Sequence, residues 1–531
     1  MILIYLLFSF WLLRQLKSQF FWIYLWQLKE YHLGRFIDHF RTAKGKRIFL
    51  NFLFLFKIFL LFVSFCFRQF PLFYFLFFIF LLEALKFLRD FFEKRVIVPI
   101  FTKKVIFLNT FSFSFLLFFL FSIFENKNFL LLILTFDILN PAIFSGIVLI
   151  FQPLTAFFRH QIIKRAIKKR ETFKNLLVIG ITGSYGKTST KEFLGTILEQ
   201  KFPRAILKTE KHQNSEIAVS KCILEKLNEN HRIFIVEMGA YNKGGISLLA
   251  KIAKPKIAIL TGVNEQHLAL FGSMENLISA EGGKELIESL PEDGLVIFNG
   301  ENKILREIYE KIKIGKKIVG IQKKDFDLWA GNIKVKRKVL FFQVFSKDGG
   351  SADFNLNLIG KQNIENILLA ACCAKELGMS LKEISLACQK ITQEQTGVKL
   401  IKTKKGFNII DATYSANPDS VIAHLEYLKT WPGKRVIIMP CLIELGSKSE
   451  EIHKKIGQKI GKICDLAIII TKDKFSQIKE GALENGMKKE HILFSEDPKE
   501  IFERIKNFNK ENDIILLEGR IKKEIQKILC E

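Results

Sequence analysis

Residues 175–194 contain a strand, a glycine-rich turn and a helix in the order that builds a phosphate-binding loop. The stretch reads NLLVIGITGSYGKTSTKEFL, and its apolar start predicts a buried strand. Gly183 and Gly186 leave room for backbone N–H groups to face an anion, and the N-terminus of the predicted helix adds partial positive charge. Lys187 can reach the β- and γ-phosphates of a nucleotide, and the Thr188 hydroxyl can bind Mg²⁺. We therefore expect an α/β domain with a nucleotide site.

The spacing of this loop departs from the strict Walker pattern, which has four residues between its first glycine and the Gly-Lys pair. Here five residues separate Gly180 from Gly186, and what remains is Thr-Gly-x-x-Gly-Lys-Thr at 182–188. The alternative is an ordinary glycine-rich turn before a helix. The lysine, the threonine and the flanking strand and helix together favour the nucleotide site.

The amino-acid composition of residues 1–150 differs from that of the rest of the chain. Of the 54 Phe, 35 lie in residues 1–150, and the remainder of the 531 residues has ordinary globular composition. The net charge of +27 is spread over scattered lysines without a recognisable nucleic-acid motif, so no nucleic-acid partner is expected. The eight cysteines include no C-x-x-C pair and no zinc spacing, which indicates thiols in a reducing compartment.

Apolar stretches near the N-terminus predict an α-helical transmembrane region over residues 1–158. Four of them approach the length of about 20 residues that a membrane-spanning helix needs, at 48–67, 70–88, 105–124 and 129–151. Met1–Leu13 is shorter and lacks a basic leader, so we expect an uncleaved first span or half-span there. Residues 20–47 mix aromatic and basic side chains, which suits a helix at the membrane interface.

Basic residues in the connecting segments predict the orientation of this region. They are dense in 14–47, 86–104 and 159–170, whereas the alternate connections are short. All three basic segments lie on the cytoplasmic side if four spans follow residue 47. The phosphate-binding loop would then lie in the cytoplasm, at the inner face of a multi-pass membrane protein, beside membrane lipids.

Two charged residues, Lys57 and Asp137, fall inside predicted spans. Charges within a membrane are rare and mark candidate functional positions. They can pair with each other or contact a lipid headgroup. Alternatively, Lys57 extends to the interface and Asp137 caps a helix break before Pro141.

Polar residues follow two further strands of the predicted sheet. Glu237 ends the apolar run 233–236, and His267 comes after the run 257–260. Ligands of α/β sheets bind at the carboxyl ends of strands, and a carboxylate there can hold the Mg²⁺ that bridges nucleotide phosphates. A lone histidine is as readily structural as functional.

Further motifs follow in order along the chain. They are Gly180–Ser189, Thr209–Asn214, Val236–Ala240, Thr261–Ser273, Lys284–Gly294 with Asn299, Gly360–Asn366, Asp411–Ser420 and Glu444–His453. This series resembles the Mur ligase family, ATP-dependent amide-forming enzymes of peptidoglycan precursor synthesis, and is most similar to the branch that adds D-alanyl-D-alanine. The resemblance covers about 172–531. It implies an α/β P-loop ATPase domain at 172–397 and a Rossmann-like α/β domain at 398–531.

The resemblance implies a reaction through an acyl phosphate, with ATP and Mg²⁺. Lys187 would neutralise developing charge, Thr188 and Glu237 would hold one Mg²⁺, and His267 would help to place a second. The loop residues at the phosphates would be Thr182, Gly183, Ser184, Tyr185, Gly186, Lys187, Thr188 and Ser189. Asn363 and Asn366 would contact the adenine end, and Asp411 the nucleotide. Substrate crevice positions would be Thr209, Asn214, Ser215, Tyr414, Asn417 and Glu444, for which a structural role in loop shape is equally open.

The chain also departs from the family pattern. The family has a lysine in the region of 281–285 that can be carbamylated and hold the second metal, and Gly283 stands at that position with Lys284 next to it. Gln362 replaces a usual histidine, Ala412 the second of two aspartates, and Val398 a usual arginine.

The family's N-terminal domain, which holds the uridine nucleotide part of the substrate, has no counterpart in the sequence. We expect the acceptor to be a muramoyl-peptide precursor, either lipid-linked at the membrane or nucleotide-linked, with D-Ala-D-Ala as the amine. The C-terminal domain would bind the amine and close over ATP. Two alternatives are another ligase of the superfamily, of the folate or cyanophycin type, and a non-catalytic membrane scaffold with a decayed ligase module.

Overall fold

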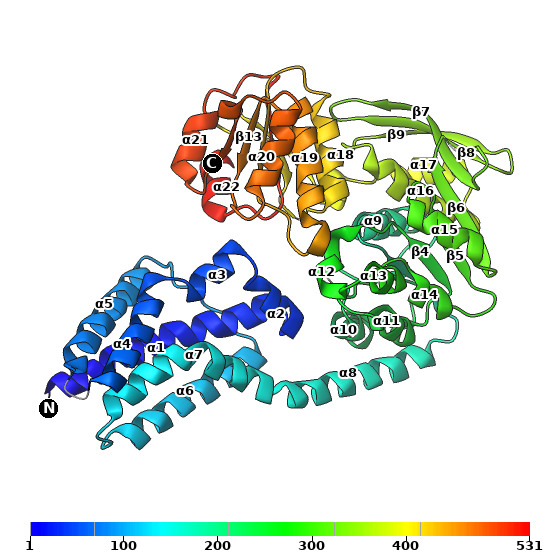
Figure 1. Cartoon of the computed structure of the whole chain (residues 1–531). Helices are drawn as coiled ribbons and strands as arrows, with labels where there is room; N and C mark the ends of the chain where they lie inside the picture. Colours follow the sequence, from blue (N-terminus) through cyan, green and yellow to red (C-terminus); the bar gives the residue numbers. More distant parts are fainter. Residues whose placement is uncertain (1, 68–69, 211–212, 323, 415, 531) are drawn as a thin grey trace. The chain divides into compact units, whose positions relative to one another are not determined.

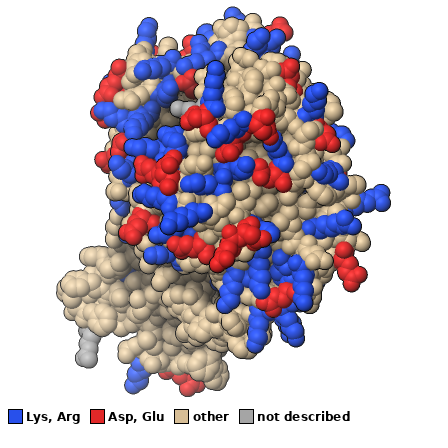
Figure 2. Space-filling model, turned by 90° about the vertical axis from the view of Figure 1, so that its right-hand side faces the viewer, with Lys and Arg blue, Asp and Glu red and all other residues tan. Residues whose placement is uncertain are grey.

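The computed structural model describes residues 2–67, 70–210, 213–322, 324–414 and 416–530 (Figure 1). The chain divides into two compact units, Met1–Arg159 and His160–Glu531. The first is helical, and the second holds two β-sheets flanked by helices. Figure 2 shows Lys and Arg side chains interspersed with Asp and Glu on the face that it displays.

The N-terminal unit consists of long helices rich in apolar residues, with two short helices, α2 and α3, after the first. They are α1 (Ile2–Leu28), α2 (Leu33–His39), α3 (Ala43–Phe49), α4 (Phe52–Cys66), α5 (Leu72–Phe92), α6 (Lys103–Ile123) and α7 (Phe129–Ile150), followed by the connecting helix α8 (Gln152–Thr172). Three helical segments of the described residues are long and apolar enough to cross a membrane, at Gly45–Cys66, Lys103–Ile123 and Phe129–Thr172. Each of the four predicted stretches is helical, but α5 is not among these three segments because charged residues occupy its second half.

The stretch predicted as an uncleaved first span or half-span, Met1–Leu13, is described from Ile2 on and forms the first part of α1. This helix has 27 residues and continues through Arg14 and Lys17. The two basic side chains do not end the helix because both are paired with acids on α5: Arg14 Nε lies 2.8 Å from Glu83, and Lys17 Nζ lies 2.7 Å from Asp90. The predicted interfacial helix at 20–47 is likewise divided between the end of α1, α2 and α3.

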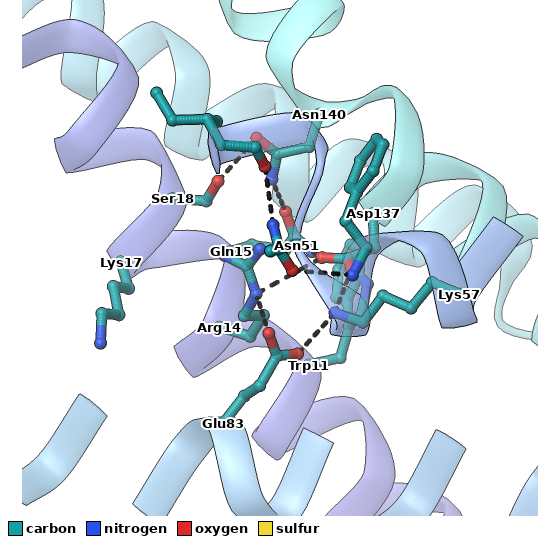
Figure 3. A network of polar contacts seen from close by, with 12 residues as sticks. Trp11, Arg14, Gln15, Lys17, Ser18, Asn51, Lys57, Glu83, Asp137 and Asn140 are labelled. Atoms are coloured by element: carbon teal, nitrogen blue, oxygen red, sulfur yellow. Dashed lines mark hydrogen bonds and ion pairs between the residues drawn. The ribbon is translucent and has the colours of Figure 1, made fainter. Parts of the chain in front are cut away.

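A buried polar network joins α1, α4, α5 and α7 (Figure 3). Lys57 Nζ lies 2.7 Å from Asp137 and 2.6 Å from Glu83, and Gln15 donates to Asp137 at 2.7 Å. Of the possibilities left open by the sequence, the structure shows the pairing of Lys57 with Asp137. The alternative is wrong, because the Lys57 side chain is only 3% exposed and α7 continues unbroken through Pro141.

The first sheet of the second unit has nine strands in the order β2-β3-β1-β4-β5-β6-β7-β8-β9. Its strands are β1 (Leu177–Thr182), β2 (Ile206–Lys208), β3 (Ile233–Glu237), β4 (Ile257–Leu260), β5 (Leu295–Asn299), β6 (Gly315–Ile321), β7 (Leu328–Val335), β8 (Leu340–Ser346) and β9 (Ser351–Leu356). Neighbouring strands are parallel from β2 through β7, and β7, β8 and β9 pair antiparallel.

Helices cover both faces of this sheet, which explains why its central strands are apolar runs rather than alternating patterns. One core cluster packs α9 (Lys187–Leu198), α16 (Gln362–Glu376) and α17 (Leu381–Cys388) against the sheet. The other packs α10 (Glu216–Lys226), α11 (Gly245–Ala253), α13 (Met274–Ala280), α14 (Lys284–Glu288) and α15 (Lys303–Lys311). The carboxyl ends of the adjacent strands β3, β1 and β4 therefore form one edge between the helical layers.

The second sheet has six strands in the order β10-β11-β15-β12-β13-β14. They are β10 (Lys399–Lys402), β11 (Asn408–Ala412), β12 (Arg435–Met439), β13 (Leu466–Ile469), β14 (Ile492–Phe494) and β15 (Ile514–Glu518). The helices are α18 (Pro418–Leu428), α19 (Ser449–Ile463), α20 (Phe475–Glu484), α21 (Pro498–Ile505) and α22 (Lys523–Cys530). The predicted parallel pairing holds from β11 to β14, whereas the edge strand β10 is antiparallel to β11.

Candidate active site

The predicted phosphate-binding loop lies between β1 and α9. Gly183 and Gly186 have φ angles of +143° and +74°, which disfavour any residue with a side chain. A Cβ atom at Gly186 would lie 2.5 Å from Asn366 Oδ1, and one at Gly183 would overlap the Thr261 hydroxyl. The Lys187 ammonium donates a hydrogen bond to the Gly183 carbonyl, so its charge lies over the loop. The site therefore has the backbone shape and the cation that phosphate binding needs.

The first residue pair at the edge of the sheet is Thr188 and Glu237. The Thr188 hydroxyl donates to Glu237 Oε2 at 3.0 Å, which joins the start of α9 to the end of β3. Hydroxyl and carboxylate oxygens are ligands that Mg²⁺ prefers. Two predicted crevice residues contact Glu237: Asn214 Nδ2 donates to its Oε1 at 3.2 Å, and the Thr209 hydroxyl accepts from its backbone N–H at 3.0 Å.

Lys191 is a residue of this site that the sequence motifs did not indicate. Its ammonium is fully buried, 3.2 Å from Glu237 and 3.3 Å from Glu192. It follows Thr188 by three positions, so the two side chains share one face of α9. That spacing was visible in the sequence, but the burial of the ammonium was not.

A second carboxylate, Glu281, lies on the other side of the loop. The Ser184 hydroxyl donates to Glu281 Oε2 at 2.7 Å, and His267 Nδ1 lies 2.8 Å from Oε1. Burial alone would raise the pKa of Glu281, but the charges of His267 and Lys187 and the hydrogen bonds from His267 and Ser184 lower it on balance. His267, predicted from its place after β4, is thus part of a hydrogen-bonded group beside the phosphate loop.

The residues predicted at the adenine end differ in their surroundings. Asn366 Oδ1 accepts a hydrogen bond from Thr190 at 3.2 Å and lies beside Gly186. Asn363 is buried and donates to the Ile359 carbonyl at 2.8 Å, so it stabilises the start of its own helix.

Polar groups around Tyr185 extend this part of the site. Asn302 donates to the Tyr185 hydroxyl at 3.3 Å, and Asn299 donates to Glu365 at 2.8 Å. Burial raises the pKa of Tyr185, and the nearby Asp419 and Glu365 carboxylates raise it further.

Three predicted residues of the C-terminal domain lie close to residues of the middle domain. Burial, with the nearby Glu237 carboxylate, raises the pKa of Tyr414, and the neighbouring Thr188 side chain opposes this shift. Asn417 caps α18 and accepts a hydrogen bond from Asn264 at 3.3 Å. Glu444 Oε2 lies 3.9 Å from His267 Nε2.

The remaining predicted residues have local structural contacts. Asp411 accepts hydrogen bonds from the backbone and hydroxyl of Thr413, which shapes the turn after β11. Ser215 is the N-cap residue of α10, and Thr182 and Ser189 belong to the end of β1 and the first turn of α9. Among the described residues, no cluster of three or more His, Cys, Asp or Glu is arranged to hold a metal. Mg²⁺ commonly takes one or two protein carboxylates and completes its shell with phosphates and water, and the Thr188–Glu237 pair fits that pattern.

This geometry is typical of a nucleotide-binding α/β domain, with a glycine-rich loop after β1, a lysine at the start of α9 and a carboxylate at the end of the adjacent parallel strand β3. Family comparison gives the assignment. The Mur ligase middle domain matches residues 181–374, and the Mur ligase glutamate ligase domain matches residues 398–521. Together they match more than half of the chain, which belongs to the Mur ligase family of ATP-dependent enzymes that form C–N bonds. The predicted family resemblance is confirmed, and the N-terminal unit lies outside both domains.

Individual relatives agree with this assignment. The UDP-N-acetylmuramoyl-tripeptide–D-alanyl-D-alanine ligase of Bacillus subtilis is 28% identical over 401 residues, 74% of this chain and 83% of that protein. The ligase of the same name from Haemophilus influenzae is 30% identical over 288 residues, 54% of this chain and 62% of that protein. The crystal structure of MurF from Acinetobacter baumannii has a TM-score of 0.62 and 25% identity, covering 70% of this chain and 79% of that one. MurF from Thermotoga maritima in complex with ADP has a TM-score of 0.60.

Proposed function

We propose that this chain adds D-Ala-D-Ala to the carboxylate of a muramoyl-peptide precursor at the cytoplasmic face of a membrane, using ATP and Mg²⁺. The observation that carries the proposal is the Thr188–Glu237 contact beside the Gly183–Gly186 loop, in a chain whose relatives are named as D-alanyl-D-alanine ligases. ATP phosphorylates the acceptor carboxylate, the amine of D-Ala-D-Ala attacks the acyl phosphate, and an amide forms with release of ADP and phosphate.

The side chains divide this work between them. The loop N–H groups and Lys187 bind the β- and γ-phosphates and reduce the repulsion between a triphosphate and a carboxylate. Bound Mg²⁺ would supply charge neutralisation at the phosphates, held by Thr188 and Glu237. Tyr414, which reaches Thr188 from the C-terminal domain, helps that domain to cover the site and exclude water from the acyl phosphate.

The membrane location is supported by the N-terminal unit. Three of its helical segments are long and apolar enough to span a bilayer, and large side chains such as Phe62, Phe118 and Phe121 are exposed on them. The basic segments at 14–47, 86–104 and 159–170 support a cytoplasmic ligase part by the positive-inside rule, provided that α5 also crosses the membrane so that four spans follow residue 47. Because this unit stands before the ligase domains, we propose that the acceptor is presented at the membrane, either lipid-linked or nucleotide-linked.

In the test, membranes that contain the full chain are supplied with ATP, Mg²⁺ and D-Ala-D-Ala. They also receive either UDP-linked or lipid-linked muramoyl-tripeptide. Mass spectrometry then shows which acceptor gains the dipeptide. Lys187→Ala should abolish the gain, and Lys243→Ala, which changes an exposed lysine, should leave it intact. If Lys187→Ala extended the acceptor as well as the parent does, the catalytic role of the loop would be wrong.

Two other functions give different results in the same assay. A folate- or cyanophycin-type ligase would leave both muramoyl peptides unchanged, but would form ADP when a folate or peptide acceptor and its amino acid are added. A scaffold with a decayed ligase module would show neither ADP formation nor extended acceptor. The intact Lys187, Thr188 and Glu237 constellation favours the ligase over the scaffold.

A further inference from the structure

Two cations and an aromatic ring come together at the first turn of α6, within the N-terminal unit. Lys104 is the second residue of α6 and is half-buried. Its Nζ lies 3.4 Å from the centre of the Tyr31 ring, which belongs to the turn between α1 and α2. Arg159 of α8 is close enough to Lys104 to act on it electrostatically. Segments that are far apart in the sequence therefore bring two positive charges together at the start of α6.

Hydrogen bonds between the elements fix this arrangement. Gln27, near the end of α1, exchanges two hydrogen bonds with the Ile100 backbone just before α6, at 2.9 and 2.8 Å. Gln152, at the start of α8, donates to the Tyr31 carbonyl at 3.1 Å. Tyr31 has a φ angle of +59°, which a residue with a bulky side chain rarely adopts. The place of its ring is thus set by the surrounding fold rather than by local preference.

The polar groups of this site have donor capacity that contacts within the chain do not use. An ammonium group has three N–H donors, and an aromatic face attracts its charge without accepting them all. The Tyr31 hydroxyl is enclosed and has no hydrogen-bond partner among the described residues, which is costly for a buried polar group. A phosphate supplies both the negative charge and the acceptor oxygens that these groups need.

The surroundings of the two cations are apolar and suit a lipid. Ile100 and Phe101, just before α6, are exposed large hydrophobic residues. Phe157 and Phe158, just before the second cation, are exposed as well. Lys104 stands at the end of a helical segment that is long and apolar enough to cross a membrane, where lysines lie at the level of lipid headgroups. A membrane lipid joins an anionic headgroup to an apolar chain and matches both features.

We propose that Lys104, Arg159 and the Tyr31 hydroxyl bind the phosphate of a membrane lipid. The two cations neutralise its charge, the hydroxyl donates to a phosphate oxygen, and the exposed apolar side chains contact the lipid chain. The three residues come from the three basic segments, 14–47, 86–104 and 159–170, so the site lies on the cytoplasmic side. The inference rests on the proposed membrane location of the chain.

Two kinds of lipid carry this chemistry, an anionic phospholipid and a lipid diphosphate to which the acceptor is linked. The test is native mass spectrometry of the full chain in a non-ionic detergent, titrated with dioleoyl phosphatidate, farnesyl diphosphate or inorganic phosphate. We expect saturable binding of one lipid per parent chain, and no binding of inorganic phosphate at the same concentrations. Tighter binding of phosphatidate indicates a phospholipid, and tighter binding of farnesyl diphosphate indicates the lipid-linked acceptor.

Two neighbouring lysines separate a specific site from a general attraction by positive charge. Lys104→Gln should weaken lipid binding tenfold or more. Lys103→Gln is the matched control, because it removes the same charge from the adjacent, exposed position, and it should weaken lipid binding less than twofold. Equal losses in the two variants would show that the lipid responds to overall charge and would overturn the site.

Tyr31→Phe keeps the ring and removes only the hydroxyl. Because this hydroxyl has no partner among the described residues, the unfolding temperature should equal that of the parent, while lipid affinity should fall at least threefold. This variant still decides if Lys104→Gln does not fold. Unchanged lipid affinity in Tyr31→Phe, or inorganic phosphate that binds as tightly as the lipids, would contradict the proposal. The assay contains neither ATP nor a muramoyl peptide, so its outcome is independent of the proposed ligase activity.

Discussion

Lys57 Nζ lies 2.7 Å from Asp137 Oδ2, although the residues are 80 positions apart and belong to α4 and α7. Both side chains are almost fully buried, and Lys57 also contacts Glu83 on α5 (Figure 3). Breaking a buried ion pair by removing one partner leaves an uncompensated charge. Lys57→Met should therefore destabilise the N-terminal unit by about 3 kcal/mol, measured by thermal unfolding of the full chain in micelles.

The control for this prediction is Lys86→Met, which removes an exposed lysine from α5. The double variant Lys57→Met with Asp137→Leu should lose less free energy of unfolding than the two single variants lose in sum. The reason is that the double variant removes both charges of the pair, whereas each single variant leaves one charge without this partner. Equal unfolding temperatures for Lys57→Met and Lys86→Met would mean that the pair contributes nothing to stability.

The same network shows why sequence reasoning described the helical unit only in part. Lys57 and Asp137 were recognisable because charges in apolar stretches are rare. Arg14 and Lys17 were interpreted as the end of a short span, because hydropathy is averaged along the chain and their partners Glu83 and Asp90 are about 70 residues away. Pairing with α5 keeps both in one helix. Contacts with residues far along the chain therefore accompany the continuation of α1 beyond its first apolar stretch.

In the ligase part, the motif residues predicted the strand–loop–helix unit, Glu237 and His267, because glycine, lysine and acidic residues occur there at characteristic positions. Glu281 and Lys191 were missed, because their roles depend on a buried side chain meeting residues from other elements. The antiparallel strands β7, β8 and β9 were also not described from the sequence.

His453 should make the Glu444 loop sensitive to mild acid. Its Nε2 accepts the Leu442 N–H at 2.9 Å, and Nδ1 donates to the Ser449 carbonyl at 2.5 Å. Burial lowers the pKa of His453, as does Lys474, while Ser449 and Asp473 oppose the shift. In the folded chain the pKa of His453 lies below the ordinary value of 6.5. The contribution of neutral His453 to the free energy of unfolding is therefore fully present above pH 6.5 and is lost as the pH falls toward the folded pKa.

Unfolding of the parent and of His453→Gln between pH 5 and pH 8 measures this effect. The advantage of the parent should shrink below pH 6.5 and stay constant above it. Lys474 and Asp473 are unchanged in both proteins, so their own titration cancels. A constant difference across the whole range would show that His453 does not take up a proton on unfolding.

Gly186 should tolerate no side chain. Its φ angle is +74°, and a Cβ atom would lie 2.5 Å from Asn366 Oδ1. Gly186→Ala should reduce ATP affinity at least tenfold in calorimetric titration, about 1.4 kcal/mol. The control is Gly195→Ala on the same helix, where the nearest atom is Cδ of the flexible Lys208 at 3.2 Å. Equal ATP affinity in the two variants would contradict the assignment of the loop.

Thr188→Val separates the hydroxyl from the shape of the loop. Valine keeps the volume of threonine but cannot donate to Glu237, which accepts the Thr188 hydroxyl at 3.0 Å, and cannot bind Mg²⁺. A hydrogen bond to a charged group contributes about 1.5–3 kcal/mol, so the Mg²⁺ concentration for half-maximal ADP formation should rise at least tenfold. Thr196→Val, near the end of α9, removes a hydroxyl that donates to the Glu192 carbonyl and accepts from Gln395, and it should leave the Mg²⁺ requirement unchanged. If both variants keep the parent's Mg²⁺ requirement, the cation is not held at the Thr188–Glu237 pair.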